Sequence, residues 1–394
     1  MHASCAPTRA RPALELADVV RAYGKAFLER HALRPEQRAA LRAIEQCRTP
    51  ALGGHLDVCG ACGYERPSYN SCRNRHCPKC QSLAQARWIE GRLGRLLPVH
   101  YFHVVFTLPS ELRALVQRSG EKLFDMLFAS AAQTLLTLAR DPERLGAELG
   151  VTMVLHTWTR ELLFHPHVHA IVTGGGLTPD GASWVPTPPE FLFPVRVMGA
   201  LFRGKMLDAL ERAHARGHIN LGDLDLRALR KKRWVVYAKR PFGGPEQVIR
   251  YLGRYTHRVG ISNQRLHGMD ERGVTFRTKG GKSVTLPGEQ MLARFVQHVL
   301  PPRFVKIRHY GLHAASNATT RLEIARLRLA PTPAVSQTHP PQAAQVLREE
   351  VLDWRALLLR LAGIDTHLCP VCQRPAVTRI ALPDARCRAP PEAA

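Results

Sequence analysis

Two C-x2-C pairs constrain the fold of this 394-residue chain more than any other feature of its sequence. Cys59 and Cys62 form the first pair, Cys77 and Cys80 form the second, and 14 residues separate the two pairs. Four thiolates at this spacing can surround one tetrahedral zinc ion, which would hold a small domain together. The alternative interpretation is a redox-active cysteine pair. The spacing favours zinc.

The same segment contains four more side chains that can bind a metal, and they could fill a second, interleaved site: Cys47, His55, Cys72 and His76. The alternative is that these four are ordinary loop residues. A last pair, Cys369 and Cys372, resembles half of a zinc ribbon, with Cys387 nearby. A closed four-cysteine site leaves no open coordination position for catalysis, so any chemistry must lie elsewhere.

The charge of the chain indicates its class of partner. Lys and Arg number 56 against 32 acidic residues, which gives a net charge of +24 and an isoelectric point near 10.3. This excess favours a polyanion, with nucleic acid first and an anionic membrane surface second. The longest charge-free apolar run, residues 126–139, is shorter than the roughly 20 residues that span a bilayer. The N-terminus has no apolar signal region, so we expect a cytoplasmic protein whose cysteines are ligands rather than disulfides.

Hydrophobic periodicity predicts an α+β fold, in which helices alternate with strands. We expect a helical start over 12–47, with a second helix from Pro35, and a sheet whose strands include the apolar run "VHYFHVVFTL". The order suits a split β-α-β sheet covered by helices on one side. The predicted strands are 99–108, 151–158, 162–176 and 234–239, with a hairpin over 274–286, and the later helices are 110–140, 193–216, 245–257 and 289–299.

The strand "LLFHPHVHAIVTGGG", residues 162–176, carries histidines at alternate positions, His165, His167 and His169. Successive side chains of a strand point to opposite faces, so His167 and His169 share a face and Val168 lies on the other. Two imidazoles placed this way can hold one metal ion. The alternative is that they are core histidines satisfied by their neighbours.

The stretch "YLGRYTHRV" places Tyr251 and Tyr255 one turn apart on a predicted helix. Such a pair is usually core packing, but arginines surround it, which is unusual for a core face. Upstream, residues 227–240 contain seven Lys or Arg and no acid, together with Trp234 and Tyr237. Basic residues mixed with aromatic ones suit single-stranded nucleic acid. The predicted DNA-binding residues are Arg250, Arg254, Arg258, Lys231, Lys232 and Arg233.

Together these groups suggest one chemistry. A metal on the histidines can polarise a phosphodiester, and nearby arginines can stabilise the charge that builds on phosphorus. A tyrosine can then attack and remain covalently bound to the DNA. Two tyrosines would permit two successive strand transfers.

The residues resemble the HUH endonucleases, in which a hydrophobic residue stands between two histidines, here His167, Val168 and His169. More narrowly, the chain is similar to the two-tyrosine rolling-circle transposases of the insertion-sequence ninety-one family over about residues 20–315. The similar stretches are "SCRNRHCPKCQ" (71–81), "HVVFTLP" (103–109), "HPHVHAIVTGGGL" (165–177), "YLGRYTHRV" (251–259) and "HVLPPRFVKIRHYG" (298–311).

The resemblance implies a bacterial, nucleoid-associated transposase that nicks and joins single-stranded transposon ends through a 5′-phosphotyrosine. It further implies an HUH-endonuclease core, which is an antiparallel sheet with ferredoxin-like topology, and an N-terminal zinc-binding domain. His167 and His169 would bind Mg²⁺ or Mn²⁺, with Glu161 and His156 as candidates for a third ligand, and Tyr251 and Tyr255 would be the nucleophiles. His165 would either support the metal ligands from behind or be structural.

On this basis we expect four segments: a helical and zinc-binding domain (12–95), the catalytic domain (96–315), a Pro-rich linker (330–344) and a tail with a short helix and the last cysteine pair (345–394). A replication initiator or relaxase would use the same chemistry, but many of those carry a fused helicase, and its G-x-x-x-x-G-K-[ST] motif has no match here. A non-enzymatic zinc-finger protein would explain the charge and the cysteines but not the histidines and tyrosines.

Overall fold

The computed structural model describes residues 12–93, 95–239, Gln247, Gly253, 260–330 and 354–384. At the centre of the molecule is an antiparallel sheet with the strand order β11-β4-β5-β3-β7, and β6 pairs with the end of β5. The strands are β3 (Tyr101–Thr107), β4 (Glu148–Trp158), β5 (Phe164–Leu177), β6 (Trp184–Pro186), β7 (Val236–Lys239) and β11 (Ile307–Gly311).

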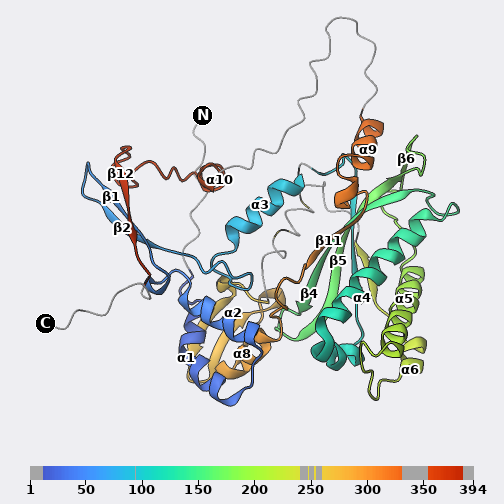
Figure 1. Cartoon of the computed structure of the whole chain (residues 1–394), viewed down its shortest axis with the longest axis horizontal. Helices are drawn as coiled ribbons and strands as arrows, with labels where there is room; N and C mark the ends of the chain where they lie inside the picture. Colours follow the sequence, from blue (N-terminus) through green and yellow to red (C-terminus); the bar gives the residue numbers. More distant parts are fainter. Residues whose placement is uncertain are drawn as a thin grey trace, which may run out of the picture.

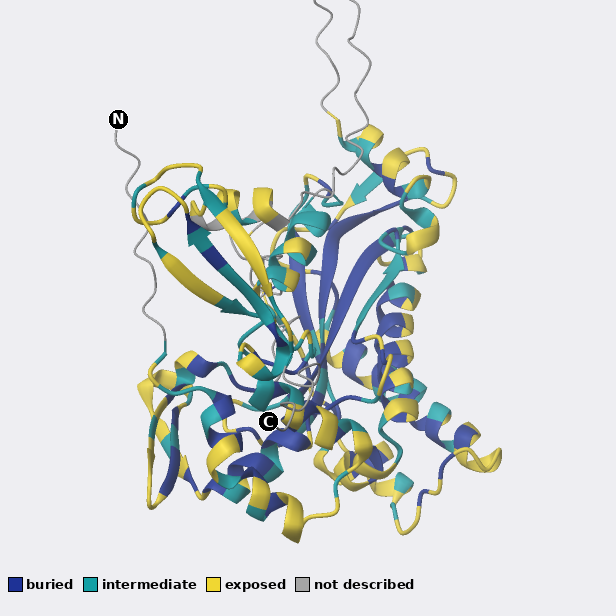
Figure 2. Cartoon of the chain, turned by 60° about the vertical axis from the view of Figure 1, so that its left-hand side comes forward, coloured by how far each residue is buried: buried dark blue, intermediate teal, exposed yellow. Residues whose placement is uncertain are grey.

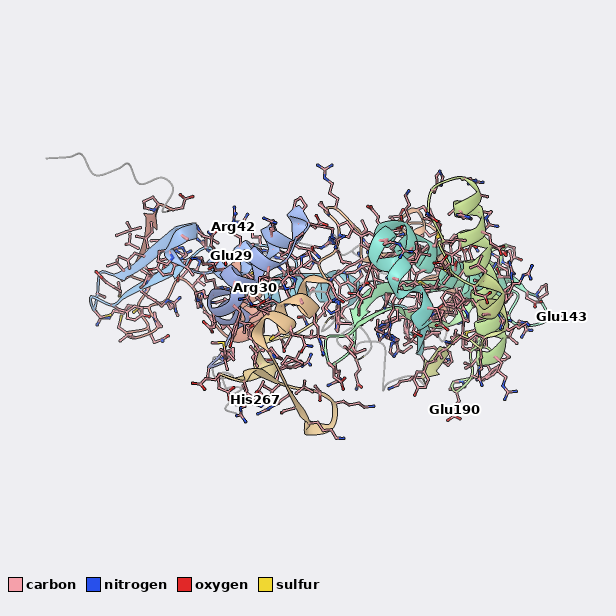
Figure 3. The ribbon with its side chains drawn as sticks, turned by 90° about the horizontal axis from the view of Figure 1, so that it is seen from below. Glu29, Arg30, Arg42, Glu143, Glu190 and His267 are labelled. Atoms are coloured by element: carbon pink, nitrogen blue, oxygen red, sulfur yellow. The ribbon has the colours of Figure 1, made fainter. Side chains whose placement is uncertain are left out.

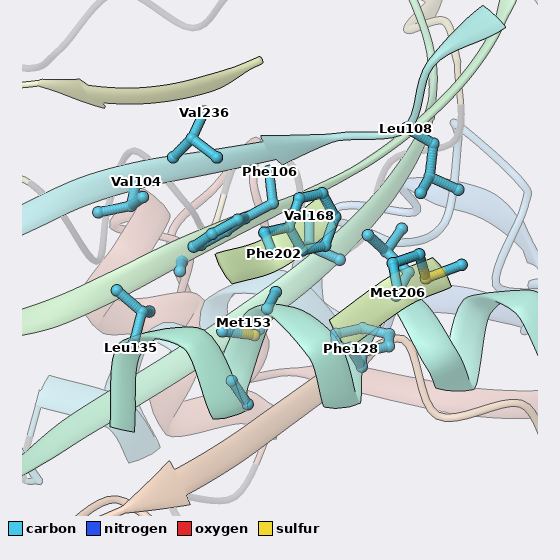
Figure 4. Close-up of a cluster of buried hydrophobic side chains, with 14 of the residues drawn as sticks. Val104, Phe106, Leu108, Phe128, Leu135, Met153, Val168, Phe202, Met206 and Val236 are labelled. Atoms are coloured by element: carbon cyan, nitrogen blue, oxygen red, sulfur yellow. The ribbon is translucent and has the colours of Figure 1, made fainter. Parts of the chain in front are cut away.

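One face of this sheet is buried under α4 (Arg113–Arg140) and α5 (Val195–Ala215), with α6 (Leu226–Lys231) beyond them (Figure 1). Strand alternation sends Phe106, Val168 and their apolar neighbours to this side, where they form the main core (Figure 4). Phe106 meets Phe202 of α5 edge to face, with ring centroids 5.1 Å apart. This packing fixes which strand residues must point to the opposite face.

The opposite face is partly covered by α3 (Ser82–Leu93), which the sequence did not predict. Trp88, Ile89 and Leu93 of α3 pack against a small cluster of buried strand residues, Tyr101, Val154 and Ile171. The predicted one-sided cover therefore holds for α4 and α5 only. The face under α3 is the one that carries the histidines.

A second core joins the start of the chain to a later segment. Helices α1 (Leu16–Arg30) and α2 (Pro35–Gln46) pack against α8 (Gly288–Val296) and a three-stranded sheet. That sheet has the order β10-β9-β8 and contains β8 (Leu266–Asp270), β9 (Gly273–Arg277) and β10 (Ser283–Leu286). The buried Gln37 amide donates to the Val296 carbonyl at 2.8 Å. Figure 3 shows Arg42 and His267 among the side chains that point away from this unit.

A third unit combines the two ends of the chain. Strands β1 (Gly54–Cys59), β2 (Glu65–Tyr69) and β12 (Val377–Leu382) form an antiparallel sheet with β1 in the middle, and α10 (Trp354–Ala362) precedes β12. This small sheet is much more exposed than the buried central sheet (Figure 2). Within the described part of the chain, no helix has both the length and the apolar character that crossing a bilayer requires.

Most predicted elements are confirmed: two N-terminal helices with the second starting at Pro35, the strands β3, β4, β5 and β7, the helices α4 and α5, and the hairpin β9–β10. The helix predicted to reach residue 299 ends at Val296. The strands β1, β2, β11 and β12 were missed because they are short, and β2 and β12 are too exposed for an apolar pattern. The predicted helix 245–257, apart from Gln247 and Gly253, and the linker beyond residue 330 lie outside the described residues.

Candidate functional site

Three histidines meet on the α3 side of the central sheet. His156 comes from β4, and His167 and His169 come from the neighbouring strand β5, where the register places His156 opposite His167. One ring nitrogen from each of the three lies within 4.8 Å of the others. The ring centroids of His156 and His169 are 4.2 Å apart. The site therefore combines the predicted pair with one of the two candidates for a third ligand.

The other candidate, Glu161, is exposed in the turn between β4 and β5 and does not belong to the group. His165 is also outside the group, although its ring lies 5.3 Å from that of His167. Its backbone carbonyl accepts a hydrogen bond of 2.6 Å from Nδ1 of His167. His165 thus fixes the tautomer of His167 through its main chain and leaves Nε2 with the lone pair that a metal needs.

A fourth histidine, His103 of β3, was not singled out in the sequence. Its Nε2 lies 2.7 Å from Nδ1 of His169, and the two rings stack with centroids 5.0 Å apart. This hydrogen bond holds the His169 ring in place, and with Nδ1 as the donor Nε2 keeps the lone pair that a metal needs. The signal was present in "HVVFTLP", since His103 stands at an alternate position of a predicted strand.

Burial keeps these imidazoles neutral at physiological pH. It lowers the pKa of His167 to about 4, and it lowers the pKa of His103 to about 4 as well. The pKa values of His156 and His169 lie well below the ordinary range, first because of burial and then because of neighbouring histidines. A neutral imidazole is the form that binds metal, so the site is ready for a cation without losing a proton.

The predicted nucleophiles Tyr251 and Tyr255 lie outside the described residues, as do Arg250, Arg254 and Arg258. Between the two tyrosines, however, Gly253 is described as helical and buried. A Cβ atom there would lie 2.4 Å from the side chain of Ile89, so Gly253 lies directly against α3. Because Ile89 packs on the histidine face of the sheet, Gly253 lies on that side too.

In the basic run of residues 227–240, some side chains lie on the surface and others in the core. Lys231, Lys232 and Arg233 are exposed, and the Lys232 ammonium pairs with Glu111 at 2.6 Å. Trp234 is buried, and its Nε1–H donates to the Leu229 carbonyl at 3.1 Å, so the tryptophan within the basic run belongs to the core. Tyr237 remains 52% exposed, and its register opposite Val105, itself opposite His169, places it on the histidine face.

A cavity of about 550 Å³ opens between the cysteine-rich segment and the start of β11. Arg75 lines one wall, and its guanidinium donates to the Phe304 carbonyl. Lys306 lines the other, and it is 8% exposed with no hydrogen-bond partner for its ammonium among the described residues. Burial lowers the pKa of Lys306 to about 7, and its charge contributes to the low pKa of His156. Sequence reasoning missed Lys306.

The cysteines form two groups, and the grouping corrects the predicted one. Cys77 and Cys80 lie with Cys47 and Cys72, whereas Cys59 and Cys62 lie with the C-terminal pair, Cys369 and Cys372. In the first group the Sγ atoms of Cys72 and Cys80 are 3.7 Å apart, and the Cys72 N–H donates to Cys47 Sγ at 3.5 Å. Hydrogen bonds from the Cys72 and Cys77 thiols lower the pKa of Cys47 to about 7. The strand β1 carries Cys59 away from Cys77, so the two predicted pairs do not share a site.

Neither histidine of the predicted second zinc site belongs to a cysteine group. His55 on β1 has its Nε2 3.6 Å from the Asp57 carboxylate. His76 is buried, and it accepts from the Leu300 N–H at Nε2 (3.1 Å) while Nδ1 donates to the Asn74 side chain (3.1 Å). His76 therefore joins the cysteine-rich segment to the end of the α8 region, which is a structural role.

Comparisons with known proteins agree with these features. A family model described as "Transposase zinc-binding domain" matches residues 19–108, and one described as "Putative transposase" matches residues 150–320. The chain is 44% identical over 386 residues to the putative transposase y4qJ of Sinorhizobium fredii, covering 93% of this chain and 94% of the relative. It is 30% identical over 313 residues to the transposase for insertion sequence element IS801 of Pseudomonas savastanoi pv. phaseolicola, covering 73% of each chain. No solved structure matches.

Proposed function

This chain belongs to the IS91 family of transposases with an N-terminal zinc-binding domain, and from that premise we propose that it cuts and rejoins single DNA strands through a covalent bond to tyrosine. The observation that carries the proposal is the convergence of three neutral imidazoles on one face of the central sheet, with His156 buried and His167 and His169 half-buried. In this proposal the sheet is an HUH core, and His167 and His169 are its paired histidines.

The donor set fits a divalent transition metal. Three imidazole nitrogens suit Mn²⁺ better than Mg²⁺, because Mg²⁺ prefers oxygen ligands and retains its waters. When bound, such an ion would polarise the scissile phosphodiester and align it. His165 and His103 would orient the two β5 ligands through the hydrogen bonds at their Nδ1 atoms. The cysteine groups and the zinc-binding-domain match support structural zinc as a separate metal.

The position of Gly253 supports Tyr251 and Tyr255 as nucleophiles. Gly253, which stands between the two tyrosines in the sequence, lies against Ile89 on the histidine face, the side of the sheet where the metal would sit. In the proposed step a tyrosine oxygen bonds to phosphorus and the phenol loses its proton, while the bond from phosphorus to the 3′ oxygen breaks and that oxygen takes up a proton. The DNA then has a free 3′ hydroxyl on one side and a 5′-phosphotyrosine on the other.

Two features support a path for single-stranded DNA to this site. The cavity lined by Arg75, Arg303 and Lys306 offers positive charge for the phosphate backbone, and the charge of Lys306 also acts on His156. At the other edge of the sheet, Tyr237 exposes an aromatic ring, and the Lys239 ammonium lies 5.7 Å from its centroid. An exposed ring with a lysine beside it suits stacking of an unpaired base.

A covalent-capture experiment tests the proposal. The full-length protein is incubated with single-stranded DNA from its own transposon end and Mn²⁺, and we expect an adduct that survives boiling in detergent and maps to a 5′-phosphotyrosine at Tyr251 or Tyr255. The double variant Tyr251→Phe/Tyr255→Phe should form no adduct and still bind the DNA. Tyr237→Phe is the matched control and should form the adduct normally. An adduct in the double variant would refute the assignment.

A further inference from the structure

The second cysteine group, formed by Cys59, Cys62, Cys369 and Cys372, lies partly outside the segment matched by the zinc-binding family model. That match ends at residue 108, whereas two of the four cysteines come from the other end of the chain. Their Sγ atoms are nevertheless close: Cys59 to Cys372 is 3.6 Å, and Cys62 to Cys369 is 3.7 Å. Four sulfurs that are each 2.3 Å from a central zinc ion in tetrahedral geometry lie about 3.8 Å apart. The spacing is therefore that of a zinc site, and it is much longer than the roughly 2.05 Å of a disulfide.

The backbone around the two C-x2-C pairs is the same, although the intervening residues differ. In the first pair the Cys59 N–H donates to the Tyr64 carbonyl (2.8 Å) and the Gly63 N–H donates to the Cys59 carbonyl (2.9 Å). In the C-terminal pair the Cys369 N–H donates to the Arg374 carbonyl (3.0 Å) and the Gln373 N–H donates to the Cys369 carbonyl (2.9 Å).

Both turns also contain a residue with a left-handed backbone at the corresponding position, Gly63 with φ of 72° and Gln373 with φ of 59°. Gln373 adopts this conformation at a cost, because a side chain disfavours positive φ. The Val371 N–H also points at Cys369 Sγ, at 3.4 Å. The two turns thus have the same backbone, and their cysteine sulfurs face one another. Together they form one site, to which the N-terminal and the C-terminal C-x2-C pairs each contribute two sulfurs.

Strand β12 brings the two cysteine pairs together. It pairs with β1 along its whole length, from Gly54 opposite Leu382 to Cys59 opposite Val377. The Arg379 guanidinium donates to the nearly buried Asp57 carboxylate at 2.8 Å, which joins the two strands by an ion pair. Without β12 the hairpin β1–β2 would be a two-stranded sheet, which is marginally stable in water.

We propose that Cys59, Cys62, Cys369 and Cys372 bind a second structural zinc ion, and that the C-terminal segment thereby completes a zinc ribbon begun near the N-terminus. Because metal binding at such a site is coupled to folding, the ribbon forms only when both segments are present. The N-terminal half of the ribbon therefore remains incomplete until residues 369–382, close to the end of the chain, have been synthesised. Zinc bound at Cys47, Cys72, Cys77 and Cys80 does not depend on that segment.

Zinc content of the purified full-length protein tests this proposal without any measurement of DNA cleavage. Cys369→Ser/Cys372→Ser and Cys59→Ser/Cys62→Ser should each lose one zinc equivalent relative to the wild type, and the variant with all four changes should also lose only one. Cys387→Ser is the matched control and should keep the wild-type content. If the C-terminal double variant keeps the wild-type content while the N-terminal one loses zinc, Cys59 and Cys62 have other partners and the proposal is wrong.

Disulfide trapping of the wild-type protein gives a second measurement that needs no variant to fold. When a chelator and a mild oxidant are added together to the zinc-loaded protein, Cys59 or Cys62 should become linked to Cys369 or Cys372 before the ribbon unfolds, because the sulfurs are already close in the assembled site. Mass spectrometry of the digest should find peptides joined across more than 300 residues of sequence. Links of Cys59 or Cys62 only to each other, or to Cys77 or Cys80, would overturn the proposal. Zinc present during oxidation should suppress the long-range links.

Discussion

His165, His167 and His169 occupy alternate positions of one strand, yet their surroundings differ. His167 and His169 are held by hydrogen bonds at Nδ1, and their rings face His156. His165 contributes its backbone carbonyl rather than its ring. A single row of identical residues thus contains two proposed ligands and one residue that orients a ligand.

These differences predict an order of sensitivity. His156→Gln, His167→Gln and His169→Gln should each reduce strand cleavage by about two to three decades, the scale of losing one preorganised electrostatic contact. His165→Gln is the control and should reduce it least, because its carbonyl remains. The measurement is single-turnover cleavage with Mn²⁺ titration at equal folded fraction, in which ligand variants need more metal. Greatest sensitivity at His165 would contradict the assignment.

Lys306 offers a separate prediction. Its buried ammonium has no partner among the described residues, which costs stability unless a ligand supplies the opposite charge. Lys306→Met should weaken binding of single-stranded DNA and slow cleavage by roughly 10- to 100-fold, the scale of a hydrogen bond to a charged group. Its melting temperature should stay equal or rise.

Lys306→Arg is the matched control and should retain more of the DNA affinity than Lys306→Met does. A lysine with a merely structural role would give the opposite result for the Met variant, with lost stability and unchanged DNA affinity per folded molecule. Calorimetric melting and fluorescence anisotropy together decide between the two.

At the scale of elements, the edge strand β7 carries Tyr237 and Lys239 on the histidine face. Tyr237→Ala should weaken binding of single-stranded DNA by about 1–3 kcal/mol, the usual worth of one base stacked on an aromatic ring. Tyr237→Phe retains the ring and should bind as the wild type does. Equal affinities of the Ala and Phe variants, measured by anisotropy at fixed salt, would show that no base stacks there.

At the scale of the whole molecule, buried histidines outside the proposed metal site make stability depend on pH. His298 is enclosed by the Thr157 hydroxyl, the Leu162 carbonyl and the Phe164 ring, and His76 is the titratable group that interacts with it. Burial lowers the pKa of His298 to about 4 and that of His309 to about 4, from 6.5. As the pH is lowered, these histidines therefore become protonated at a higher pH in the unfolded chain than in the folded protein.

The resulting stabilisation is fully present above pH 6.5 and is lost as the pH falls from there towards 4. Within this window, each such histidine changes the free energy of unfolding by about 1.4 kcal/mol per pH unit. Urea unfolding between pH 7.5 and 4.5, with zinc content monitored, should show the decline, and His298→Gln should show a shallower one. The same slope in both proteins would mean that His298 titrates normally.

The sequence alone determined what depends on a few neighbouring residues. Strand alternation placed His167 and His169 on one face, Pro35 marked a helix start, and each C-x2-C pair formed a local turn. Backbone geometry over two to five residues sets these features, so a pattern in the sequence is enough to predict them.

Only the tertiary structure decided which distant groups meet. It brought His156 from β4 to the histidine pair, buried Lys306 where its charge acts on His156, and joined Cys59 and Cys62 to Cys369 and Cys372. The last pairing depends on β1 and β12, which are short and more than 300 residues apart, and β12 is largely exposed. The sequences of these two strands do not indicate that they pair with each other. Their pairing is stabilised by backbone hydrogen bonds, which any strand can form, and by cysteine ligands, which any C-x2-C pair could provide.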